Sequence, residues 1–83
     1  MYIPSPQALA QFVIHQRKKL KLSQEEVGNR VGLKQKTISA FENRPEGTKI
    51  DTLFDILSAV NLDLNISPKN EDASIQSEWK EEW

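Results

Sequence analysis

One stretch, Leu22 to Asn43, constrains the fold of this chain more than any other part of the sequence. It has the sequence LSQEEVGNRVGLKQKTISAFEN, in which the Ser23 hydroxyl can cap a helix and Glu26, three residues later, can bond back to the cap. Gly32 follows where a helix commonly ends on a residue in the left-handed conformation. The stretch therefore predicts a short helix, a tight turn and then a second helix.

Apolar residues at helical spacing predict how these two helices pack. Val27 and Val31 lie four apart on one face of the first helix, and Ile38 and Phe41 lie three apart on the second. Leu33 can fill the corner between the helices. The outward face of the second helix then carries Gln35, Lys36, Ser39 and Ala40. This spacing is that of a helix-turn-helix, whose second helix enters the DNA major groove, although a plain helical hairpin has the same geometry.

The residue types favour the first interpretation. The stretch resembles the Cro/C1-type helix-turn-helix family on the motif S-Q-E-E-x-x-x-x-V-G-L-x-Q-x-T-I-S-x-F-E-N. The resemblance implies that Gln24 contacts phosphate and braces the recognition helix, and that Glu42 and Asn43 end that helix. It also implies groove-facing residues at Gln35, Lys36 and Ser39. Gly28 departs from the alanine usual in the family, at a cost of up to about 1 kcal/mol in helix propensity.

Length and composition limit the chain to one domain. Eighty-three residues bury a modest core, so dimerisation is a common source of stability at this size. The sequence has no cysteine, which excludes a thiolate metal site, and no run of roughly 20 apolar residues that could cross a membrane. The net charge of −1 divides unevenly: residues 1–67 have nine Lys/Arg against seven acids, and residues 68–83 have two against five. A mildly basic domain therefore precedes an acidic tail.

The segments on either side of the motif also have helical patterns. Ser5 can cap a helix from about Pro6 to Leu20, and the resemblance leads us to expect a phosphate contact from Arg17 near its end. His15 has no partner at ligand spacing, so no metal role is expected. After the breakers Pro45 and Gly47, a further helix carries the apolar residues Ile50, Leu53, Phe54, Ile56, Leu57 and Val60. Its cap is expected at Thr48 or Asp51, and Phe54 is expected either within the core or at a dimer contact.

Residues 61–67 change from helical to alternating periodicity. Leu62, Leu64 and Ile66 alternate with Asp63 and Asn65, which predicts a half-buried β-strand. A single strand leaves its edges unpaired, and its natural partner is the same strand of a second copy. The predicted fold class is therefore all-α, a Cro/C1-like helical bundle with a helix-turn-helix and a short C-terminal strand that pairs across a dimer. An extended loop with chance alternation is the alternative.

The tail from Pro68 onward, PKNEDASIQSEWKEEW, is polar and acidic and is expected to be disordered when alone. It nevertheless carries Trp79 and Trp83, and tryptophan contributes strongly to binding. We therefore divide the chain into a DNA-binding and dimerisation domain, residues 1–67, and a partner-binding tail, residues 68–83. An incidental, tag-like ending is the other interpretation of the tail.

The whole layout resembles the HipB-type antitoxins within the Cro/C1-type family. The resemblance extends beyond the helix-turn-helix to T-L-F-D-I-L at 52–57, L-D-L-N-I at 62–66 and the final E-W. It implies a homodimer that binds an operator upstream of its own operon and holds a HipA-like serine/threonine kinase toxin inactive. It also implies stronger repression when the kinase is bound. In that family the terminal tryptophan docks in the toxin, which carries over to Trp83, whereas Trp79 has no matched counterpart.

A mechanism follows from these expectations. A two-fold dimer presents its recognition helices about 34 Å apart, so the operator should be near-palindromic. Gln35 suits bidentate contact with adenine, Lys36 suits guanine acceptors, and Ser39 suits a base edge or a phosphate. Phosphate contacts are expected from Gln24, Lys34, Thr37, Asn43 and Thr48, with added charge from Arg44 and Lys49.

Other functions stay open from the sequence alone. A stand-alone repressor would use the same domain without the tail, and an antitoxin of a ribonuclease toxin would direct the tail to another target. A purely protein-binding module would not use Gln35 and Lys36. An enzyme is not expected, because the sequence shows no nucleophile–base pair and no phosphate-cradling loop, and no cofactor is expected. The expected location is the cytoplasm, in association with the nucleoid.

Overall fold

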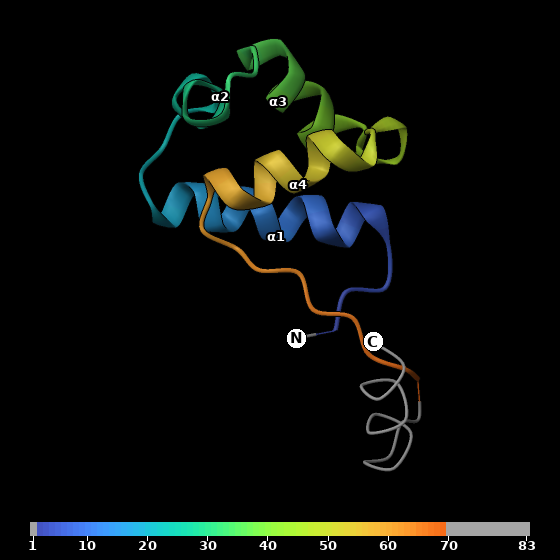
Figure 1. The fold of residues 1–83 in the computed structure, drawn as a ribbon. Coiled ribbons are helices and arrows are strands. Elements are labelled where there is room, and N and C mark those ends of the chain that lie inside the picture. Colours follow the sequence, from blue (N-terminus) through green and yellow to red (C-terminus); the bar gives the residue numbers. More distant parts are fainter. Residues whose placement is uncertain (1, 70–83) are drawn as a thin grey trace.

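The computed structural model describes residues 2–69, which form an all-helical bundle (Figure 1). Its elements in chain order are α1 (Pro6–Lys19), α2 (Gln24–Val31), α3 (Gln35–Asn43), the 3-10 turn η1 (Pro45–Gly47) and α4 (Ile50–Ala59). The predicted helix-turn-helix is confirmed as α2 and α3. None of the helices in this part of the chain combines the length and the hydropathy that crossing a membrane needs.

Local sequence signals begin and end the first two helices. The Ser5 Oγ accepts a hydrogen bond from the Ala8 N–H at 3.1 Å at the start of α1. At α2 the predicted capping box is present: the Ser23 Oγ accepts from the Glu26 N–H at 3.0 Å, and the Ser23 N–H donates to the Glu26 carboxylate at 2.8 Å. This backbone hydrogen bond lowers the pKa of Glu26. Gly32 ends α2 in the left-handed conformation, with φ of 73°.

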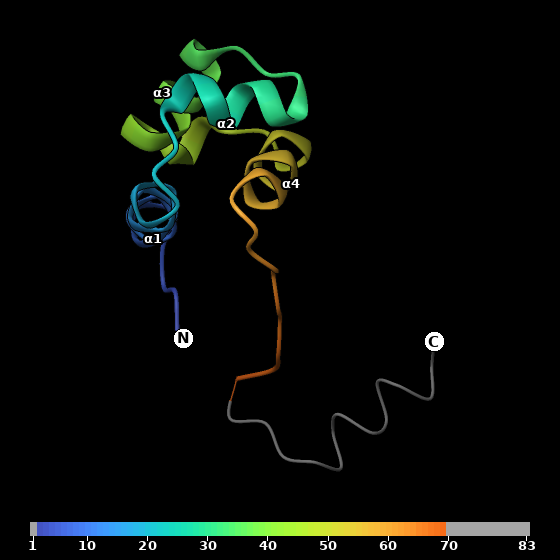
Figure 2. The same cartoon turned by 90° about the vertical axis from the view of Figure 1, so that its left-hand side faces the viewer.

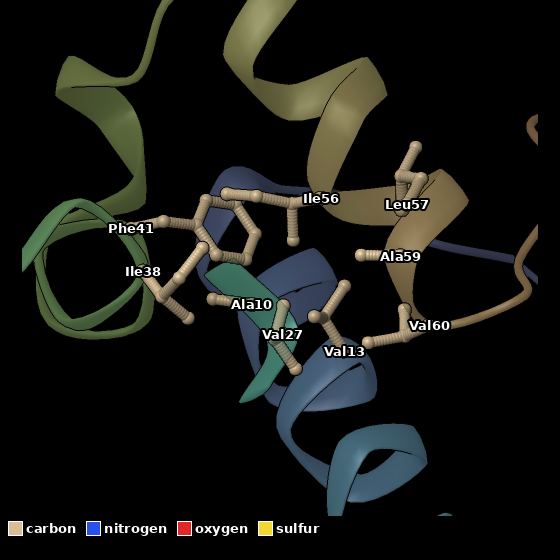
Figure 3. Close-up of a cluster of buried hydrophobic side chains, with 9 residues drawn as sticks. All are labelled: Ala10, Val13, Val27, Ile38, Phe41, Ile56, Leu57, Ala59 and Val60. Atoms are coloured by element: carbon tan, nitrogen blue, oxygen red, sulfur yellow. The ribbon is translucent and has the colours of Figure 1, made fainter. Parts of the chain in front are cut away.

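Each of the four helices contributes to one small hydrophobic core (Figure 3). Val27 from α2 joins the α1 and α4 side chains in this cluster, and Ile38 and Phe41 project into it from α3. The buried set is Ala10, Val13, Val27, Ile38, Phe41, Ile56, Leu57, Ala59 and Val60. Leu33 packs against this core from the corner between α2 and α3, as the sequence predicts.

Two polar side chains fix the carboxyl end of α4 to other helices. Gln16 in α1 donates to the Val60 carbonyl at 3.0 Å, and Arg30 in α2 donates to the Ala59 carbonyl at 3.0 Å. The last carbonyls of a helix have no partners within the helix, so these side chains satisfy them. The start of the segment that follows α4 is therefore held against both α1 and α2.

The two ends of the described chain leave the bundle on the side opposite α2 and α3. Figure 2 shows α1 and α4 end-on, with α2 and α3 on one side of them and the N-terminal arm and residues 61–69 extending from the other. The chain consequently separates the helix-turn-helix from the segment predicted to dimerise.

Three expectations for the region after α3 need correction or qualification. Neither Thr48 nor Asp51 caps α4: its N-cap is Lys49, no side chain caps it, and Asp51 already lies in the first turn. Phe54 is not a core residue, because it is 54% exposed. Residues 62–68 form no strand within this one chain, and a pairing that requires a second copy stays a prediction. The expectations for Trp79 and Trp83 lie outside the described residues.

The positive φ at Gly32 generates the first prediction. Gly32→Ala should lower the free energy of unfolding by about 1–2 kcal/mol, because a Cβ is disfavoured in the left-handed region. Gly47→Ala is the matched control: no atom lies near its added Cβ and its φ is not positive, so we expect almost no change. Urea unfolding followed by circular dichroism measures both. Equal stability of the two variants would contradict the assigned role of Gly32.

Candidate nucleic-acid interface

One face of α3 packs into the core, and the opposite face is exposed and accessible to a ligand. Ile38 and Phe41 are almost completely buried, so the opposite face of α3 points away from the bundle. Gln35, Lys36 and Ala40 are exposed, and Ser39 is half-buried. A short helix with one exposed polar face is the element that enters a DNA major groove.

A basic hollow lies beside this face, between the start of α3 and the start of α4. The sequence-predicted residues that line it come from both sides of η1: Lys34, Lys36, Thr37, Arg44, Thr48 and Lys49. Thr52 also lines it and was missed by the sequence analysis, because its position in α4 gives no signal of proximity to α3. Four cations and several hydroxyls in one concave surface suit the phosphate backbone of DNA. Together with α3, this hollow forms the candidate interface.

A network of polar side chains connects the exposed face to the interior. The Gln35 Nε2 donates to the Gln24 Oε1 at 2.5 Å, and the Gln24 Nε2 donates to the Glu42 Oε1 at 2.9 Å. Arg17 donates to both oxygens of Glu42, from Nε at 2.7 Å and from Nη2 at 3.1 Å. We call these four residues the polar network. It places Gln24 against the recognition helix.

The polar network corrects the expectation for Arg17. Its side chain is only 12% exposed, is ion-paired with Glu42, and also donates to the Leu22 carbonyl at 3.0 Å. These bonds direct the guanidinium into the bundle instead of toward a phosphate. The sequence offered an acidic partner for Arg17, because Glu42 is part of the helix-turn-helix motif. The two residues are 25 positions apart, however, so their spacing does not show that they form an ion pair.

Asn43 and Ser39 are joined to one another at the end of α3. The Asn43 Nδ2 donates to the Ser39 carbonyl at 3.0 Å and to its Oγ at 3.2 Å. This arrangement holds the exposed Asn43 side chain against Ser39, one helical turn earlier in α3. Their predicted contacts with DNA stay predictions.

Gly28 has a structural reason to depart from alanine. A Cβ at this position would collide with the Leu33 carbonyl oxygen, because the turn after α2 folds back over the helix. The Leu33 N–H donates to the Gly28 carbonyl at 2.9 Å and holds the turn in this place. The turn between α2 and α3, as it is folded here, therefore leaves no room for a side chain at position 28.

No metal centre accompanies these residues in the described range. Within residues 2–69, no group of three or more His, Cys, Asp or Glu side chains is arranged to hold a metal ion. The candidate interface is built from amides, hydroxyls and cations, the groups that contact the phosphate and sugar of nucleic acids.

Comparisons with known proteins agree with this geometry. Residues 14–66 match the Helix-turn-helix family. The chain is 34% identical to Antitoxin HipB of Escherichia coli O6:H1 (strain CFT073) over 98% of its own length and 87% of the relative's. It is also similar, with TM-scores of 0.80 and 35% identity, to chains in a HipB-O4 20mer complex and a HipA-HipB-O2-O3 complex. Each alignment covers 83% of this chain and 97% of the other.

Arg17 and Glu42 generate the second prediction. Arg17→Met should lower the free energy of unfolding by about 3 kcal/mol, because it leaves the Glu42 carboxylate, 5% exposed, without its counter-charge. Lys18→Met, at the exposed neighbouring position, should change it by less than about 0.5 kcal/mol. Urea denaturation of both variants is the measurement. A loss no larger for Arg17→Met than for Lys18→Met would contradict a structural role for the ion pair.

Proposed function

Because this chain belongs to the helix-turn-helix family and, within it, to the family of Antitoxin HipB, we propose that it is an antitoxin and transcriptional autorepressor. It binds a near-palindromic operator as a homodimer and neutralises a HipA-like serine/threonine kinase toxin. The observation that carries the DNA-binding part is the basic hollow beside the exposed face of α3. The solved structures similar to this chain include HipB together with HipA, which supports the toxin partner.

The DNA contacts divide into base and phosphate contacts. Gln35 and Lys36 lie exposed on α3 and contact base edges in the major groove. The hollow receives the phosphate backbone through Lys34, Thr37, Arg44, Thr48 and Lys49. Gln24, Ser39 and Asn43 complete the set at the two ends of α3. Binding of this kind requires no cofactor and no catalytic group.

An exposed apolar surface supports the homodimer. Ile50 and Phe54 lie one helical turn apart on α4 and are 70% and 54% exposed. Leu64 and Ile66 in the extended segment are 47% and 87% exposed, and both line a hollow with Phe54. Exposed apolar area of this extent favours association, and a second copy covers it across a two-fold axis. Leu62 contributes differently, since it already packs against the core of its own chain.

The two functions use different parts of the chain. Residues 1–67 bind DNA and dimerise, and residues 68–83 reach the toxin, with Trp83 as the anchor. The mild positive charge of the first part and the negative charge of the second support this division. A DNA-bound regulator of this kind works in the cytoplasm, in association with the nucleoid.

Gln35 and Lys49 generate a paired prediction for DNA binding. Gln35→Ala should cost about 1–3 kcal/mol for the operator and remove base preference at one position, because it deletes a base contact. Lys49→Ala should weaken binding to all sequences alike and reduce the salt slope by about one, because it deletes a phosphate contact.

Fluorescence anisotropy with labelled operator and with single-base variants, at several salt concentrations, separates the two effects. An equal loss on every operator variant for Gln35→Ala would contradict its role in base recognition. A protein that binds no DNA, but retains a protein partner, would replace the repressor function with a purely protein-binding module.

Trp83 generates a prediction for the partner. A pull-down with the full chain should recover a HipA-like kinase, identified by mass spectrometry, and deletion of Trp83 should weaken this recovery. Recovery of a ribonuclease would assign the antitoxin to another toxin. Tight operator binding with no protein partner would favour a stand-alone repressor, and equal recovery by both forms would remove Trp83 from the mechanism.

A further inference from the structure

The polar network has a direction, and that direction begins at Glu42. An ionised carboxylate only accepts hydrogen bonds, whereas a glutamine amide both donates and accepts. Arg17 donates to both Glu42 oxygens, as expected for an ionised carboxylate. The lone pairs that remain on these oxygens can only accept further hydrogen bonds. The Gln24 amide must therefore face Glu42 with Nε2, as the 2.9 Å hydrogen bond shows.

The same constraint passes from Gln24 to Gln35. With its Nε2 directed at Glu42, Gln24 presents Oε1 to the recognition helix, and an oxygen there can only accept. Gln35 therefore donates to it from Nε2. This places the Gln35 Oε1 as an acceptor for an external donor and leaves the second Nε2 hydrogen as a donor beside it. Within residues 2–69 neither of these two groups has another hydrogen-bond partner.

We infer that Glu42, although it does not contact DNA, determines which base Gln35 prefers by fixing the orientation of the Gln35 amide through Gln24. Adenine presents an N6 donor beside an N7 acceptor, and a glutamine with a fixed acceptor and donor matches that pair in one orientation only. Rotating the Gln35 amide by half a turn exchanges its oxygen and nitrogen. The amide N–H would then face the adenine N6 donor, and the amide oxygen would face the N7 acceptor. The inference rests on the proposed DNA-binding function, and it adds a positioning residue that lies behind the interface.

Glu42→Gln tests the inference, because it preserves shape while allowing the residue either to donate to Gln24 or to accept from it. The adenine preference at the position contacted by Gln35 should fall about tenfold, while the preferences at other operator positions and the salt slope stay unchanged. Gln24→Met interrupts the network without touching the Arg17–Glu42 pair, so it should cause the same loss of adenine preference at that position. Because Gln24 is also a proposed phosphate contact, this variant should in addition bind every operator variant more weakly by a uniform factor.

Glu46→Gln is the matched control. Glu46 is also a glutamate that accepts a hydrogen bond from a glutamine, Gln7 Nε2 at 3.2 Å, and its substitution removes the same charge. It lies outside the polar network, so the base preference should match that of the unmodified protein. Anisotropy titrations of all four full-length proteins against operator variants with each base pair at that position give the comparison, with circular dichroism to confirm folding.

A second measurement uses the protein without DNA. In ¹H–¹⁵N spectra, the side-chain amide signals of Gln24 and Gln35 should exchange slowly with water in the unmodified protein and faster in Glu42→Gln. Unchanged amide signals, or changed signals with an unchanged base preference, would overturn the inference while leaving the proposed function intact. If the unmodified protein bound no operator, the proposed function would fail, and the inference about base preference would fail with it.

Discussion

The ion pair between Arg17 and Glu42 is the interaction on which the rest of this structure depends. It joins the end of α1 to the end of α3, and the same guanidinium holds the Leu22 carbonyl at the start of the helix-turn-helix. Both side chains are largely shielded from water, where an unpaired charge is costly. The pair therefore fixes the end of the recognition helix to α1, in addition to the core packing of Ile38 and Phe41.

The polar network that starts from this pair connects stability with recognition. Each hydrogen bond along it orients the next side chain, so a group at the DNA-facing surface takes its geometry from a nearly buried carboxylate. Preorganisation of this kind reduces the entropy that a flexible glutamine loses when it binds a base edge. The same hydrogen bonds hold the exposed Gln35 side chain in one position on the surface of the domain.

The arrangement of the two ends gives the molecule two separate surfaces. The helix-turn-helix lies on one side of α1 and α4, and the arm and residues 61–69 leave from the other (Figure 2). Gln16 and Arg30 anchor the carbonyls at the end of α4, so the apolar segment starts from a fixed point. In our proposal a dimer formed through this segment leaves both recognition helices free to contact DNA.

The sequence by itself determined the four helices of residues 2–69, because their signals are local. The Ser23–Glu26 capping box, Gly32 and the apolar spacing of Ile38 and Phe41 each act within a few residues, and the structure confirms all of them. Only the tertiary structure decided which side chains meet across the chain. It turned Arg17 inward onto Glu42, left Phe54 exposed, and brought Thr52 beside α3, since such contacts depend on how the helices pack and not on spacing along them.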